Sequence, residues 1–396
     1  MRLERLLIAL LAGAPVVAAI NFRWIIALLI LAFVTAVALS ILHLNTRALI
    51  IERVTRRWTT AESLAIATVT WMVVSIFWAP ELKGAASAVL GPLSIMCAAL
   101  VTNVALKTIP TARIFSALVN CTFAGMGIAI VGALTVRFSL FGCCRPALAG
   151  DMVGAAPKLI LFIWPCLGWL VHKQRLAQAL ALVLMGLILV TVSRSGAAGL
   201  AFATGMIVIG IGLFLPRLVL ILPAALLLLG FIAAPHLGFL HILLEWPTLA
   251  AYLTRFSAAE RVHIWTHYAE LFWQRPWAGF GFRAERLLDG SMFPSSLPGE
   301  ARLHPHNEPL QVLFEFGVIG ATLLWSAIAA FTHRLLRSAG PQTGYVIAPG
   351  IAFLASSLVN FSLWESWWLA VFAIVLIFTN HLQLRLLNSQ ARSLSE

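Results

Sequence analysis

Long apolar runs without charge recur from one end of the sequence to the other, and they limit the chain to very few folds. Each run is long enough, or nearly long enough, to cross a lipid bilayer as a helix. The runs lie at residues 6–20, 24–43, 63–79, 86–106, 114–135, 156–171, 176–193, 197–214, 218–234, 309–332, 343–361 and 366–383. Hydrophobic residues make up 61% of the chain and charged residues only 11%, which excludes an ordinary soluble protein. The sequence therefore predicts an all-α polytopic membrane protein with about twelve transmembrane helices in a single domain, residues 1–396.

The distribution of positive charge predicts the orientation of these helices. The net charge is +12, but the basic residues are scattered through short loops and form no arm or stripe that would favour nucleic acid. If both termini are cytoplasmic, fifteen Lys and Arg residues fall on the inner side and six in short outer loops, as the positive-inside rule requires. The six outer residues are Arg23, Lys83, Arg137, Arg145, Lys158 and Arg194. The long loop 235–308, between the ninth and tenth predicted helices, then faces outward.

The sequence contains no recognisable metal site. Only two aspartates occur, Asp151 and Asp289, and no CxxC, HExxH, DxD or DxxD pattern is present. His263 and His267 stand four residues apart, as a metal-binding pair on a helix would, but no third ligand accompanies them. We therefore interpret these two histidines as interfacial, and we expect no metal and no cofactor.

The outward loop is predicted to contain an amphipathic helix. Ser257 and Glu260 form a capping-box pattern, after which apolar residues recur at helical spacing until Pro276. Arg261 follows in the first turns, where a cation opposes the helix dipole, so it either pairs with an acidic neighbour or has another role. The next stretch, Trp277–Phe282, is a turn punctuated by two glycines.

The polar segment Arg302–Gln311 opens directly into an apolar helix and is a candidate functional site. His306 and Asn307 would stand where that helix begins, and its unpaired N–H groups and positive dipole end favour an anion there. The alternative is structural, with Asn307 capping the helix and His306 lying at the interface. At the junction of the seventh and eighth predicted helices, Ser195 can cap the eighth helix. Arg194 beside it either binds an anion or snorkels to lipid phosphate.

Taken together, these motifs resemble the O-antigen ligase and O-antigen polymerase superfamily. The resemblance covers residues 190–320 best, and its single long outer loop is most similar to the ligases. It rests on Ser193-Arg194-Ser195-Gly196, on Arg261-Val262-His263-Ile264-Trp265, on the Gly-Phe-Gly-Phe turn, and on His306-Asn307 followed by Leu310-Gln311, Glu315-Phe316-Gly317 and Gly320.

The resemblance implies a reaction and its participants. Such ligases transfer a glycan from undecaprenyl diphosphate to the lipid A-core oligosaccharide, on the periplasmic side of the bacterial inner membrane. The resemblance implies that His306 is the general base for the acceptor hydroxyl, and that Arg194 and Arg261 stabilise the leaving diphosphate without metal. The anomeric carbon would be inverted. Arg302 and Asn307 would add further contacts to the substrate.

Several alternatives stay open. His304 stands two residues before His306 and competes for the role of base. A polymerase of the same superfamily would use the same donor with a second lipid-diphosphate glycan as the acceptor. A transporter would also be polytopic, but transporters tend to have internal repeats and charged residues near the bilayer midplane, whereas most ionisable residues here lie at the ends of predicted helices. A glycosidase-like pair of carboxylates is not favoured, because the acidic residues of the outward loop show no distinctive pairing.

Overall fold

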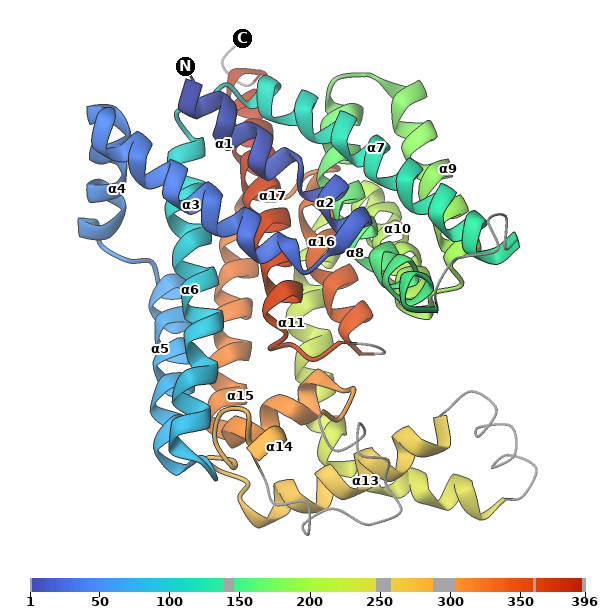
Figure 1. Ribbon diagram of the computed structural model, residues 1–396. Coiled ribbons are helices and arrows are strands. Elements are labelled where there is room, and N and C mark those ends of the chain that lie inside the picture. Colours follow the sequence, from blue (N-terminus) through green and yellow to red (C-terminus); the bar gives the residue numbers. More distant parts are fainter. Residues whose placement is uncertain (1, 139–145, 247–257, 288–303, 359–360, 394–396) are drawn as a thin grey trace.

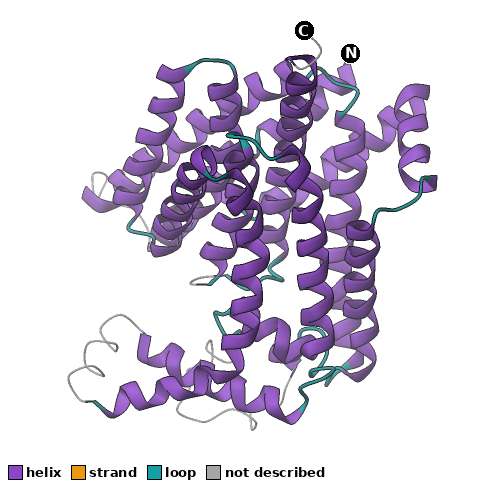
Figure 2. Cartoon of the chain, turned by 180° about the vertical axis from the view of Figure 1, so that it is seen from behind, coloured by secondary structure: helices purple, strands orange, loops and turns teal. Residues whose placement is uncertain are grey.

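The computed structural model describes residues 2–138, 146–246, 258–287, 304–358 and 361–393, and every regular element within these ranges is a helix (Figures 1 and 2). The first half contains α1 (Arg2–Ala12), α2 (Ala14–Asn21), α3 (Trp24–Leu42), α4 (Leu44–Thr55), α5 (Thr60–Val74), η1 (Ser75–Trp78), α6 (Leu82–Leu106), α7 (Thr111–Phe138), α8 (Pro146–His172) and α9 (Leu176–Ser193). The second half contains α10 (Gly196–Phe214), α11 (Pro216–Ala233), η2 (Ala234–Glu245), α13 (Ala258–Gln274), α14 (Ala284–Leu287), α15 (Glu308–Leu335), η5 (Leu336–Ser338), α16 (Thr343–Ser357) and α17 (Ser366–Ser393). The predicted all-α polytopic fold is confirmed.

The number of membrane spans is slightly lower than predicted. Within the described ranges, ten helices are long and apolar enough to cross a membrane, and α1 and α2 add an eleventh if this pair, bent by 43°, counts as one span. The predicted span 343–361 corresponds to α16, which has only 15 residues. The basic stretch after α3, expected to be an inner loop, forms the additional helix α4. About twelve apolar segments are therefore present, but ten or eleven of them qualify as spans.

The two chain termini and the outward loop lie at opposite ends of the molecule. Figure 1 shows both termini at the upper end and α13 and α14 at the lower end. The helices α5 and α6 reach down to the lower end, and α15 packs against α5. The orientation expected from the positive charges, in which the termini are cytoplasmic and the loop 235–308 faces outward, stays a prediction.

The most buried span is α8, and its Lys158 is not an outer-loop residue. The side chain of Lys158 lies within the helix and is only 1% exposed. Its Nζ atom donates a hydrogen bond to the carbonyl of Gly154 and lies over three aromatic rings. These rings are Phe22 at 3.8 Å, Trp367 at 4.5 Å and Phe361 at 5.2 Å from Nζ to the ring centroid. Cation–π contacts of this kind fix the α2–α3 turn and the α16–α17 connection against α8.

Near its N-terminal end, α15 is broken into two helices. The predicted span 309–332 is confirmed as α15, but Gly317 within it has φ 63° and ψ −168°, which no helix contains. The first part, 308–316, lies across the lower end of the bundle, and the second part, 318–335, rises beside α5 and α6 (Figure 1). A sharp change of direction in a helix needs an identifiable cause, and here it is a glycine in a backbone conformation that other residues rarely adopt.

The Gly-Phe-Gly-Phe turn satisfies the backbone groups that the break leaves free. After the break, the N–H groups of Val318 and Ile319 donate to the carbonyls of Pro276 and Trp277, at 2.8 and 3.2 Å. Because unpaired backbone groups are costly in an apolar surrounding, this pairing stabilises the broken geometry. The three carbonyls before the break accept hydrogen bonds as follows: Phe314 from Phe280 N–H at 2.8 Å, Glu315 from Gly281 N–H at 2.8 Å, and Phe316 from the Trp71 indole at 3.1 Å.

The fit between the turn and the broken helix requires glycine on both sides. A Cβ atom at Gly317 would lie 2.2 Å from the carbonyl oxygen of Trp277. A Cβ atom at Gly279, which has φ 68°, would lie 2.4 Å from the carbonyl carbon of Glu315. Two motifs that are separate in the sequence therefore form one interlocked structure, and it holds the start of α15 in place.

Candidate functional site

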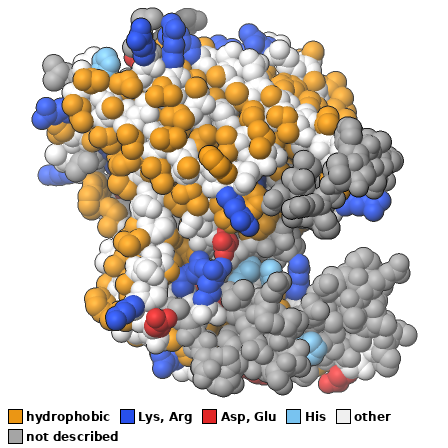
Figure 3. Space-filling model, in the orientation of Figure 1, with side chains coloured by type: hydrophobic (Ala, Val, Ile, Leu, Met, Phe, Trp, Pro, Cys, Tyr) orange, Lys and Arg blue, Asp and Glu red, His pale blue; other side chains and the backbone are white. Residues whose placement is uncertain are grey.

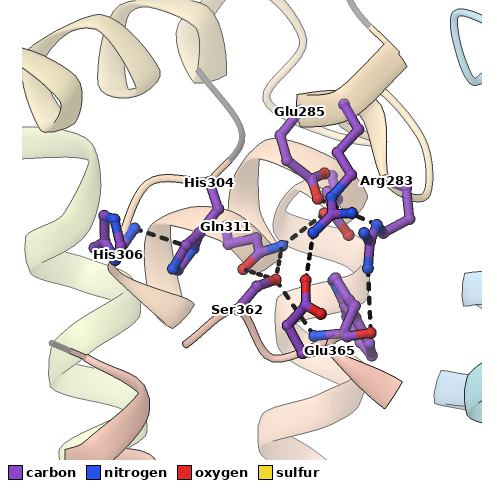
Figure 4. Close-up of polar contacts among 10 residues, drawn as sticks. Arg283, Glu285, His304, His306, Gln311, Ser362 and Glu365 are labelled. Atoms are coloured by element: carbon purple, nitrogen blue, oxygen red, sulfur yellow. Dashed lines mark hydrogen bonds and ion pairs between the residues drawn. The ribbon is translucent and has the colours of Figure 1, made fainter. Parts of the chain in front are cut away.

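Two histidines stand side by side immediately before α15. The rings of His304 and His306 have centroids 4.1 Å apart at an angle of 54°. The backbone N–H of His306 donates to Nδ1 of His304 at 3.1 Å, and His306 itself has a positive φ of 49° (Figure 4). Since Nδ1 of His304 accepts this bond, the proton of its neutral ring must be on Nε2. The turn thus commits one nitrogen of His304 to the backbone.

Burial and nearby arginines keep both histidines neutral. Burial lowers the pKa of His304 to about 2, and His306, Arg286, Arg261 and Arg283 act in the same direction. Burial, assisted by the charge of Arg261, lowers the pKa of His306 to about 4. The Nδ1 atom of His306 has no hydrogen-bond partner among the described residues. At neutral pH, His306 is therefore an unprotonated imidazole beside cationic groups, and it can accept a proton.

The predicted loop helix brings Arg261 to this pair. It is observed as α13, and Arg261 lies half-buried near its start, as expected. The indole of Trp265, one turn further on, donates to the carbonyl of Pro305 at 2.8 Å, which ties α13 to the histidine segment. The predicted capping residue Ser257 lies outside the described residues.

The other predicted site residues are placed in different ways. Asn307 caps α15, because its Oδ1 atom accepts from the N–H of Leu310 at 3.0 Å. Ser195 caps α10 as expected, accepting from Ala198 N–H at 3.3 Å, and Arg194 beside it is exposed with φ 52°. Among the described contacts, none joins Arg194 to the histidines. Arg302 lies outside the described residues.

A buried polar cluster next to the histidines was not predicted. Nε2 of Gln311 donates to Glu315 at 3.0 Å and to Ser362 at 3.2 Å, and all three side chains are buried (Figure 4). Arg283 forms an ion pair with Glu285, with 3.3 Å from Nε to Oε1. A Gln and a Glu four residues apart in an apolar run were the available signal, because buried polar groups need partners on neighbouring helices.

Two arginines connect the loop to the α16–α17 connection. Arg283 donates from Nη1 to the carbonyl of Trp364 at 3.1 Å. Arg286 forms an ion pair with Glu365, and both of these side chains are partly exposed. Phe361 in the same connection and Trp367 at the start of α17 lie against Lys158. The site is therefore bounded by the loop, α15 and the α16–α17 connection.

The chemistry that this arrangement supports is proton transfer beside a bound anion. A neutral imidazole can take a proton, and guanidinium groups around it can bind phosphate oxygens in a planar, two-pronged contact. Within the part of the chain that the structure describes, no three His, Cys, Asp or Glu side chains are grouped to hold a metal ion. His263 and His267 show no third ligand there either.

The fold and the site define a polytopic membrane protein with two adjacent histidines and several arginines at the end opposite its termini. Residues 179–325 match the family model described as O-antigen ligase. This range contains Arg194, Arg261, His306 and the first part of α15.

The chain is also similar in sequence to proteins named as ligases. A protein of Rickettsia bellii that carries the name of a polysaccharide ligase is 26% identical over 238 residues, which is 55% of this chain and 55% of that protein. The O-antigen ligase of Pseudomonas aeruginosa is 27% identical over 279 residues, 66% of this chain and 61% of that protein. The chain thus spans between half and two thirds of the length of these relatives. No solved structure matches the chain.

Proposed function

We propose that the protein transfers a glycan from undecaprenyl diphosphate to the lipid A-core oligosaccharide, at the periplasmic face of the bacterial inner membrane. The observation that carries this proposal is the neutral His306 beside Arg261 at the start of α15, inside the region that matches the O-antigen ligase family. Both substrates are anchored in lipid, and a site at the outer end of a helical bundle is accessible to such molecules.

His306 is the general base in this proposal. Its imidazole accepts the proton of the acceptor hydroxyl while the hydroxyl oxygen attacks the anomeric carbon of the donor. The bond from that carbon to the diphosphate oxygen breaks, the diphosphate leaves with both bonding electrons, and the configuration is inverted. His304 is less suited to this role, because its Nδ1 already accepts the N–H of His306.

Arginines stabilise the departing diphosphate. Arg261 lies close enough to influence the charge state of both histidines, so an anion that binds it also lies near the base. Arg194, Arg302 and Asn307 are proposed as further substrate contacts. No metal is needed for this step, because fixed guanidinium groups supply the positive charge on which the transition state depends.

Reconstitution with defined substrates tests the proposal. The purified protein in lipid vesicles would receive a lipid-linked polysaccharide and lipid A-core, and the joined product would be followed by gel mobility. A polymerase would instead extend lipid-linked single repeats into a ladder and leave lipid A-core unmodified, and that result would replace the ligase with the polymerase alternative. A transporter would yield neither product.

A further inference from the structure

The ion pair between Arg286 and Glu365 is the exposed edge of the polar cluster. The Arg286 side chain is 40% exposed and that of Glu365 is 29% exposed, whereas Arg283 and Glu285 beside them are nearly or fully buried. Arg283 is fixed by Glu285 and by the carbonyl of Trp364. Of the two arginines that reach the α16–α17 connection, Arg286 is therefore the one that an incoming molecule can contact.

Arg286 also lies close to the histidine pair. Its charge is among those that act on His304, together with Arg261 and Arg283. Figure 4 shows the histidines on one side of Gln311 and Ser362 and the Glu365 carboxylate on the other. In Figure 3, Lys or Arg side chains and His side chains are neighbours on the described surface below the apolar upper body. An anion bound at Arg261 would thus have a second guanidinium within the same site.

We propose that Arg286 is an additional contact for the diphosphate of the lipid-linked donor, and that Glu365 is the counter-ion that this diphosphate displaces. This inference rests on the proposed function. The carboxylate of Glu365 already holds the Arg286 guanidinium in place. Binding of the diphosphate therefore replaces one oxygen ligand of the guanidinium with another of higher charge, and the Arg286 side chain loses little further conformational freedom. The released carboxylate of Glu365 is partly exposed and can be hydrated in its place.

The competing explanation is that the ion pair has only a structural role. In that case the ion pair only ties α14 to the α16–α17 connection, and removing either partner has the same effect. In the proposed exchange the two partners have opposite effects, because Arg286 binds the donor and Glu365 competes with it. The sign of the Glu365 effect therefore separates the two explanations.

The experiment uses the full-length protein in detergent with undecaprenyl diphosphate as the probe, and it measures binding, transfer kinetics and thermal unfolding. Arg286→Ala should weaken binding of the probe about tenfold or more, which is typical of losing a charged hydrogen bond. Arg286→Lys should fall between this variant and the native protein. Glu365→Gln should bind the probe more tightly, because the neutral amide competes less with the diphosphate for Arg286. Arg217→Ala, which removes an exposed arginine at the start of α11, is the matched control and should bind the probe as the native protein does.

Three outcomes would overturn the inference. In the first, Arg286→Ala binds the probe normally. In the second, Arg286→Ala and Glu365→Gln both weaken binding and both lower the unfolding temperature, as expected for a purely structural ion pair. An effect confined to the KM for lipid A-core would assign Arg286 to the acceptor's phosphates instead. A different result would contradict the proposed function: the native protein binds undecaprenyl diphosphate but transfers no glycan to lipid A-core. In that event, the binding measurements still decide the role of Arg286.

Discussion

The pH dependence of transfer follows from the protonation state of His306. Burial and Arg261 lower the pKa of His306 to about 4, so the base stays unprotonated in moderately acidic solution. At pH 5.5 a base with a pKa of about 4 is about 97% unprotonated, whereas a histidine at its ordinary value would be about 9% unprotonated. For the free enzyme, kcat/KM at pH 5.5 should therefore stay within a few per cent of its plateau, rather than fall about tenfold.

Bound donor should shift the acid limb of the pH profile, where activity falls as His306 becomes protonated, to higher pH. The diphosphate brings negative charge next to Arg261 and His306, which favours the protonated imidazole and raises its pKa from the value in the empty site. Because kcat reports the enzyme with its substrates bound, the acid limb of kcat should lie at higher pH than that of kcat/KM. Arg261→Ala removes the cation that lowers the pKa of His306, so its limb in kcat/KM should also lie at higher pH.

The assay is transfer between pH 4.5 and 8 with purified protein, at several donor concentrations. His304, with a pKa of about 2, does not titrate in this range, so it does not contribute to the limb. Donor binding and thermal unfolding, measured at each pH, separate a change in the donor or in the fold from a change in the base. A limb of kcat/KM centred near pH 6.5, unaltered in Arg261→Ala, would refute the reasoning.

Four further outcomes can be measured on the same preparation. Arg194→Lys and Arg261→Lys should each lower transfer about tenfold or more, because lysine lacks the two-pronged contact, while insertion is unchanged; near-normal transfer by both variants would indicate lipid anchoring. His306→Ala should abolish transfer with donor binding largely intact, and His304→Ala should be milder; an active His306→Asn enzyme would remove His306 from the role of base. Transfer should persist in excess EDTA, and a loss that Mg²⁺ or Mn²⁺ restores would contradict metal independence. Gly317→Ala should lower the free energy of unfolding by about 2 kcal/mol or more, since φ is positive and Cβ meets a carbonyl; an unchanged denaturation midpoint would exclude this account.

The membrane helices could be predicted from the sequence because the bilayer sets a simple requirement. A run of about twenty apolar residues has few alternatives to a spanning helix, and the predicted run 176–193 coincides with α9 (Leu176–Ser193). The break at Gly317 could not be predicted in the same way. Hydropathy is continuous across it, and only the fit of the turn Trp277–Phe282, which lies 35 to 40 residues earlier in the chain, requires the backbone to change direction there.

The candidate site was predictable only where its residues stand at helix ends. His306 and Asn307 precede an apolar helix, and Arg261 begins an amphipathic one, so each was visible as a polar residue at a boundary. Ser362 and Glu365 lie in the short connection between two predicted spans and gave no such signal. Their partners are 51 and 79 residues away in the chain, and only the packing of α14, α15 and the α16–α17 connection brings them together.

The break in α15 explains how one helix can both span the membrane and carry the site at its surface. As a straight helix, its 28 residues would be about 42 Å long, which exceeds a hydrocarbon core of about 30 Å. His306 would then stand well outside the hydrocarbon core, away from the diphosphate of the proposed lipid-anchored donor. With the turn at Gly317, residues 318–335 supply about 27 Å of spanning helix. The first part lies across the bundle instead, so its polar Gln311 and Glu315 are buried against neighbouring segments, and the proposed function places His306 at the level of its lipid-linked substrates.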